Sequence, residues 1–142
     1  MPNDIIKTEE TAIDSTNPTA GSIWTSITAE TRDERAKLYA AVSDAESLEE
    51  HISERLDVVD VVIEGIEVQD PLTQEMRPAN RIVLVCEDGS AYASVSTGVE
   101  GAIKKMFSII GSPTWTPALP IVAEKRPGKN GFKFTTLNLW KD

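Results

Sequence analysis

The chain has 142 residues, 40% hydrophobic and 26% charged, with a net charge of −9, which suits one domain with a modest core. No apolar run reaches the roughly 18 residues of a membrane span, and the first residues lack the basic start and apolar stretch of a signal peptide, so we expect a cytoplasmic protein. One Cys and one His exclude an internal disulfide and argue against a transition-metal centre.

The charge is unevenly distributed. Residues 1–80 hold 18 acidic and 6 basic side chains, a net charge of −12, whereas residues 81–142 hold 5 acidic and 8 basic ones, a net charge of +3. Such asymmetry often accompanies nucleic-acid binding. An acidic surface that merely prevents aggregation would give the same total, so both interpretations stay open at this point.

The N-terminal third is polar and then rich in helix formers. Residues 1–20 have no apolar period, which predicts a disordered tail. Residues 22–28 alternate as a short strand does, and residues 29–52 predict one or two short helices or turns. Ser47 with Glu50 three residues later has the spacing of a capping box.

From Leu56 onward the apolar period becomes two. Residues 56–69 predict a long strand, with Gly65 as a bend or bulge. Residues 70–80 contain two prolines and predict a loop. Residues 81–96 then predict two strands joined at Asp88-Gly89, because an Asp-Gly pair favours a tight hairpin turn.

A helix follows the hairpin without a linker. Thr97 and Glu100 have capping-box spacing, and Gly111 with Pro113 predicts the end of the helix. The proline-rich segment that follows carries Trp115, which we interpret as a structural plug. The chain closes with two strands around residues 126–131.

This order of elements predicts a mostly β fold. A long bent strand, a strand pair, a helix and a second strand pair give the order of the oligonucleotide/oligosaccharide-binding (OB) fold, a five-stranded Greek-key barrel with a helix between strands three and four. We expect residues 21–142 to form one domain, in which residues 55–142 are the barrel and residues 21–54 an N-terminal strand and helix extension.

A groove for single-stranded nucleic acid needs flat rings for base stacking and cations for phosphates. In the last strand Phe132 and Phe134 share one face, and Leu137 and Leu139 share the other. If the leucines point inward, both rings lie outside, beside a basic loop. The alternative is that both rings belong to the core.

Three more rings are candidates. Tyr92 alternates with serines while Ala91 and Ala93 alternate on the other face, so we expect Tyr92 to point outward, as a stacking platform or as a cover for the barrel end. Trp24 and Tyr39 either serve the groove or pin the extension to the barrel. The candidate stacking residues are Tyr92, Phe132, Phe134, Trp24 and Tyr39, and the candidate phosphate contacts are Arg81, Lys125, Arg126, Lys129, Lys133, Arg32 and Lys37.

The sequence contains no motif for catalysis. There is no glycine-rich phosphate loop, no Gly-x-Ser-x-Gly and no His-Glu-x-x-His. We interpret His51 as a surface residue and Cys86 as part of the core. We therefore expect no enzyme activity, no metal and no cofactor.

Several short motifs resemble one family. They are an Asp-Gly-small-x-Tyr strand, a Ser-x-Ser/Thr step into a helix, and a Lys-x-Asn/Gly turn into an aromatic strand that ends in Leu-Asn-Leu. In this chain they are Asp88-Gly89, Tyr92, Ser94 to Thr97, Lys129-Asn130-Gly131, Phe132, Phe134 and Leu137-Asn138-Leu139. With them, residues 22–140 resemble the single-stranded DNA-binding proteins of small podoviruses that replicate linear genomes by protein priming. The proline-rich segment 111–120 departs from that pattern.

The resemblance implies a function. It implies that many copies coat the displaced strand during phage DNA replication in the host cell cytoplasm, without sequence preference. The partners would be single-stranded DNA and replication proteins such as the phage polymerase, with no membrane contact. The alternative is an adaptor module of similar fold whose exposed rings meet another protein.

Overall fold

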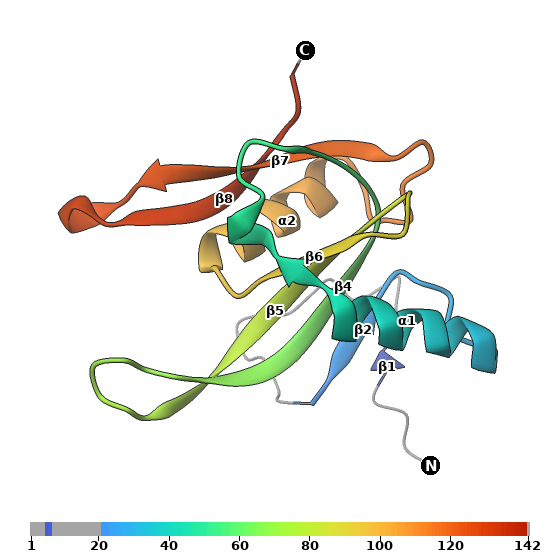
Figure 1. The fold of residues 1–142 in the computed structure, drawn as a ribbon, viewed down its shortest axis with the longest axis horizontal. Coiled ribbons are helices and arrows are strands. Elements are labelled where there is room, and N and C mark those ends of the chain that lie inside the picture. The colour runs from blue at the N-terminus through green and yellow to red at the C-terminus, as the bar shows by residue number, and fades with distance from the viewer. Residues whose placement is uncertain (1–4, 7–20, 142) are drawn as a thin grey trace.

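The computed structural model describes residues 5–6 and 21–141 (Figure 1). In chain order the elements are β1 (Ile5–Ile6), β2 (Ile23–Thr25), α1 (Arg32–Asp44), β3 (Glu46–Ser47), the 3₁₀ turn η1 (Leu48–Glu50), β4 (Arg55–Gln69), β5 (Met76–Cys86), β6 (Ala91–Ser94), α2 (Thr97–Ile109), β7 (Leu119–Pro127), the 3₁₀ turn η2 (Lys129–Gly131) and β8 (Lys133–Leu139). The predicted tail 1–20 lies outside the described residues except for β1. The division between residues 21–54 and 55–142 stays a prediction.

Strands β4 to β8 are the five strands of an OB-like barrel, so the predicted fold class is confirmed. β4 pairs with β5 and with β7, β5 pairs with β6, and β7 pairs with β8, all antiparallel. α2 connects β6 to β7, which is the predicted position between the third and fourth barrel strands. Residues 70–75 alone form the turn between β4 and β5, so the predicted loop at 70–80 is shorter than expected.

The barrel is partly open at β8. Within the described part of the chain β8 pairs with β7 only, and its other edge faces the start of α2. There the Ser96 hydroxyl donates to the Thr135 carbonyl oxygen at 2.7 Å, and the Thr136 hydroxyl donates to the Gly98 carbonyl oxygen at 3.2 Å. Side-chain hydrogen bonds to α2 thus take the place of a strand ladder along this edge.

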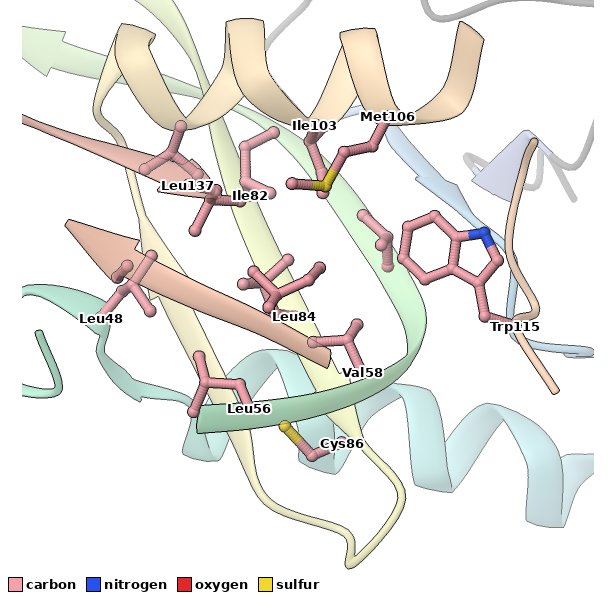
Figure 2. Close-up of a cluster of buried hydrophobic side chains, with 14 of the residues drawn as sticks. Leu48, Leu56, Val58, Ile82, Leu84, Cys86, Ile103, Met106, Trp115 and Leu137 are labelled. Atoms are coloured by element: carbon pink, nitrogen blue, oxygen red, sulfur yellow. The ribbon is translucent and has the colours of Figure 1, made fainter. Parts of the chain in front are cut away.

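The main core lies between the curved sheet and α2. Figure 2 shows Ile103 and Met106 of α2 pointing toward Leu84 and Leu137 of the strands. Trp115 fills the side of this cluster and is buried. Its backbone N–H donates to the Val59 carbonyl oxygen at 2.8 Å, and its indole N–H donates to Gly111 at 3.0 Å. Trp115 is therefore the structural plug that the sequence predicts.

The irregularity in β4 is not where it was expected. Of the predicted bend or bulge at Gly65, the bulge is wrong, because Gly65 keeps regular register with Asn80 on β5, while the bend stays a prediction. The register shift lies between Val58 and Asp60, so Val59 is the extra residue. A bulge leaves the carbonyl of the extra residue outside the strand ladder. In this chain the Val59 carbonyl oxygen accepts the hydrogen bond from the Trp115 backbone N–H.

Both helices begin with a side-chain cap, but at other residues than predicted. α1 is capped by Thr31, whose hydroxyl accepts from the Glu34 N–H while the Glu34 carboxylate accepts from the Thr31 N–H. Ser47 makes no capping hydrogen bond, and its hydroxyl donates to Glu49 instead. The predicted capping box at Ser47 is therefore not formed, and Ser47 precedes the 3₁₀ turn η1 and not an α-helix.

α2 starts one residue earlier than the prediction places it. Ser96 is the cap, and its hydroxyl oxygen accepts from the Gly98 N–H at 3.1 Å. Thr97 is the first helical residue. Glu100 does not complete a box, because its carboxylate accepts from the Asn80 side-chain amide at 3.0 Å. This hydrogen bond ties the first turn of α2 to β5.

Helix α1 covers the outer face of β5 and β6. Leu38 of α1 packs in a second buried cluster with Val83 of β5 and with Ala91 and Ala93 of β6. The alanines allow the helix to approach the sheet closely, and they occupy the outer face. Tyr92 consequently points to the inner side, against the main core, so the prediction that it faces outward is wrong.

Candidate nucleic-acid interface

The surface that OB folds ordinarily offer to oligonucleotides is largely covered in this protein. OB folds bind them on the face of strands two and three and on the loops beside it. Strands two and three are β5 and β6, and α1 lies across their outer face. Two hairpins extend from the barrel on the same side of the molecule, clear of α1 (Figure 1).

The two hairpins have opposite charge. Residues 124–133, the cationic arm, join β7 to β8 and hold four basic side chains and one acidic side chain. Residues 67–77, the acidic arm, join β4 to β5 and hold three acidic side chains and one basic side chain. Phosphate binding rests on Lys and Arg, so the cationic arm is the candidate interface.

The cations of this arm point into solvent. Strand pairing continues to Pro127 and Lys133, and the turn closes through η2, where Gly131 has a φ of +78°. The four exposed cations of the arm are Lys125, Arg126, Lys129 and Lys133. The Arg126 guanidinium pairs with the Glu124 carboxylate at 2.9 Å, an exposed ion pair of small energy that a phosphate can replace.

Both phenylalanines lie outside the core. Phe132 is 75% exposed and Phe134 is 42% exposed, whereas Leu137 on the opposite face is only 6% exposed. The predicted alternation of the last strand is thereby confirmed as far as Leu137. Leu139 departs from it, because its side chain is 37% exposed although it pairs with the buried Ile121 of β7.

Two glycines hold the ring of Phe134. A Cβ on Gly98 would lie 2.7 Å from that ring and would collide with the Thr135 carbonyl oxygen. A Cβ on Gly128 would lie 3.0 Å from the Phe132 carbonyl oxygen and 3.3 Å from the opposite edge of the Phe134 ring. The ring is therefore fixed between the first turn of α2 and the turn of the arm. Sequence reasoning missed both glycines, although a Gly in the first turn of a helix, where Ala is more stable, is a visible signal.

The remaining predicted rings lie elsewhere. Tyr92 is half-buried, and its ring centre lies 4.7 Å from that of His51 in an edge-on arrangement. Trp24 is half-buried against Phe107, with ring centres 5.5 Å apart, which agrees with the pinning interpretation. Tyr39 is exposed on α1, apart from the cationic arm (Figure 1). Stacking by these three rings stays a prediction.

The remaining predicted cations are also separate from the arm. The Arg81 guanidinium pairs with Glu64 at 3.1 Å and donates to the Val42 carbonyl oxygen at 3.1 Å. It therefore connects β4, β5 and α1. Arg32 and Lys37 are exposed on α1. Their phosphate contacts stay predictions, and we do not include them in the candidate interface.

No arrangement for catalysis or metal binding appears in the described part of the chain. Burial raises the pKa of the Cys86 thiol to about 11, so it is protonated at neutral pH. His51 lies between Glu54 and Glu46, whose hydrogen bonds raise its pKa. Among residues 5–6 and 21–141, no group of three or more His, Cys, Asp and Glu side chains is placed to hold a metal ion. No helix among them is long and apolar enough to cross a membrane.

The comparisons with known proteins point to one family. Neither the curated proteins nor the solved structures give a match. The family model described as phage single-stranded DNA-binding protein matches residues 19–140, which is most of the chain and includes the whole barrel and the cationic arm. The chain belongs to the phage single-stranded DNA-binding protein family.

Proposed function

We propose that the protein coats displaced single strands during phage DNA replication, without sequence preference, and that it holds them on the cationic arm. In this proposal Phe132 and Phe134 stack on bases. The four basic side chains that neutralise phosphates are Lys125, Arg126, Lys129 and Lys133. The observation that supports it is the exposure of both rings among these cations, in a chain whose net charge is −9.

The chemistry of the arm suits binding that ignores sequence. Every base has a flat face, so a ring accepts any of them, and each stack contributes about 1–3 kcal/mol. Four phosphate contacts on a single strand predict a slope of log K against log salt of about −3.

Family membership favours DNA binding over the adaptor alternative. Within the proposal the protein acts in the cytoplasm of the host cell, where phage DNA is replicated, and it carries out no catalytic step. The acidic N-terminal half repels duplex DNA and is the surface for replication proteins such as the phage polymerase.

The test compares the two exposed arm tips. Phe132→Ala should weaken binding of fluorescently labelled oligo(dT) about tenfold, measured by anisotropy, because one stack is lost. The matched control is Leu72→Ala, since Leu72 is 91% exposed at the tip of the acidic arm. Both variants should melt at the wild-type temperature. If Phe132→Ala binds as tightly as Leu72→Ala does, the cationic arm is not the stacking surface.

A further inference from the structure

A groove runs along α2 beside β8, next to the cationic arm. Its volume is about 550 Å³, which lies in the range of pockets that hold small organic ligands. One wall is α2, from Thr97 to Ile110, and the other is β8, from Phe134 to Leu139. Arg126 belongs both to this groove and to the cationic arm, and Phe134, which also lines the groove, directly follows the arm in β8, so the two surfaces are continuous.

The lining combines three kinds of groups. Phe134, Met106 and Ile109 offer apolar surface, and Ile109 is 76% exposed although it is a large apolar side chain. Asn138 offers the NH2 of its side-chain amide, whose oxygen accepts from the Leu139 N–H, and Thr136 offers its hydroxyl oxygen as an acceptor, because its hydrogen is donated to the Gly98 carbonyl oxygen. The cations Arg126 and Lys105 lie along the rim, and the lining contains no acidic residue.

A second groove of the same volume shows that this charge is not general. It lies between α1 and the β5–β6 hairpin, and its volume is also about 550 Å³. Its charged lining residues are one cation, Lys37, and four acids, Asp44, Glu46, Asp60 and Glu87. A polyanion would be repelled there. Size alone therefore does not select a groove for DNA, whereas charge does.

We propose that the α2–β8 groove is a second nucleotide-binding segment, in which the strand leaving Phe134 lays bases against the apolar walls and sets phosphates on Arg126 and Lys105. The proposal rests on the proposed function, because it extends the path that begins on the cationic arm. The occupant is single-stranded nucleic acid, since apolar walls, base-edge partners and a rim without acids match its three chemical parts. In this proposal Lys105 contacts a DNA phosphate.

The phosphate part is tested by a pair of neighbouring lysines. Lys105→Gln and Lys104→Gln remove the same charge from the same helix, but only Lys105 lines the groove. Binding of oligo(dT) is measured over a range of salt concentrations. Lys105→Gln should reduce the magnitude of the salt slope by about 0.7, the value for one phosphate contact on a single strand, while Lys104→Gln should leave it unchanged. Equal slopes for the two variants would overturn the contact.

The base part is tested by filling the groove at Gly101. A Cβ built there meets no atom within 4 Å, so a side chain can leave the backbone at this position without collision. A Leu at this position covers the preceding turn of the helix, beside Gly98. Gly101→Leu should bind long oligo(dT) about tenfold more weakly. The control Gly101→Ala leaves most of the groove open and should stay close to wild type. Both should melt at or above the wild-type temperature.

A length series separates this proposal from the function on which it rests. Oligo(dT) from about 4 to about 16 nucleotides spans the usual site sizes of OB folds. Phe132→Ala should weaken binding at every length, and Gly101→Leu only for the longer strands. If Phe132→Ala weakens binding and Gly101→Leu does not at any length, the groove holds no nucleotide while the arm remains. If neither variant weakens binding, the proposed function fails as well.

Discussion

The two arms have the same architecture but opposite chemistry. Each is an antiparallel hairpin that extends beyond the barrel, and each has a large apolar side chain exposed at its tip, Leu72 on one and Phe132 on the other. The acidic arm carries Glu67, Asp70 and Glu75, whereas the cationic arm carries four bases. The fold thus supplies two equivalent projections, and side chains alone decide which of them can hold a polyanion.

The comparison also shows what the N-terminal extension does. α1 covers the outer face of β5 and β6, where an OB fold ordinarily binds. In the proposed function the DNA path therefore lies on the β7–β8 side. On that side the ring of Phe134 is held between Gly98 and Gly128.

Removing the charge of the cationic arm tests most directly whether the two arms differ in DNA binding. Replacing Lys125, Lys129 and Lys133 together by Gln should weaken oligo(dT) binding about a hundredfold at about 0.1 M salt and should reduce the salt slope by about 2. The control neutralises the acidic arm by Glu67→Gln and Glu75→Gln, which should strengthen binding slightly. Anisotropy titrations measure both. Similar losses in the two variants would mean that charge on the arms has no positional role.

The attachment of the cationic arm to α2 can be broken at Gly98. Gly98→Ala brings a Cβ against the Thr135 carbonyl oxygen and the Phe134 ring, and should lower the free energy of unfolding by about 1–3 kcal/mol. Gly101→Ala, one turn later with open space around its Cβ, should raise it by up to about 1 kcal/mol. Urea unfolding measures both. A Gly98→Ala variant as stable as wild type would contradict the close contact.

The role of the second ring can be separated from packing. Phe134→Leu keeps apolar volume between the glycines but removes the flat face, so binding should weaken about fivefold while the melting temperature changes little. Affinity is measured per folded molecule by anisotropy, and folding by circular dichroism. A loss of stability with unchanged affinity would assign Phe134 to the core and leave Phe132 as the sole ring on the arm.

The smallest expected effect lies away from both arms, at His51. Hydrogen bonds that its ring donates to the carboxylates of Glu54 and Glu46 hold its pKa above the ordinary value of 6.5. The charged form is favoured in the folded state, so this stabilisation is complete below pH 6.5 and is lost as the pH rises through the raised folded value. Thermal melts across this range should show it, and His51→Gln should remove it. DNA affinity should not follow the same titration.

The sequence predicted the elements that depend on local patterns. The Asp88-Gly89 turn, the helix before Gly111 and the final hairpin all form where their residues indicate. The last strand could be interpreted because one face meets the core and the other meets solvent, so alternation carries information. The cationic arm was accessible to sequence reasoning for this reason.

The predictions fail where contacts between elements distant in the sequence determine the direction or the partner of a side chain. Tyr92 was misplaced because both faces of β6 are covered, one by α1 and one by the core, and alternation then does not identify the outer face. The register of β4 and β5 places Glu64 opposite Arg81, so the two side chains form an ion pair. The sequence alone does not indicate this register. The α2–β8 groove joins residues far apart in the chain, and only the fold brings them together.

The most direct test of the account is a map of the surface that a strand touches. The ¹⁵N-labelled protein is titrated with oligo(dT) at low salt while the backbone amide resonances are followed by NMR. The account predicts that the largest shifts fall in residues 125–138 and along the groove face of α2, with residues 67–77 unchanged. The account would be contradicted if the shifts were concentrated on the acidic arm or on α1 while the resonances of the cationic arm stayed unchanged.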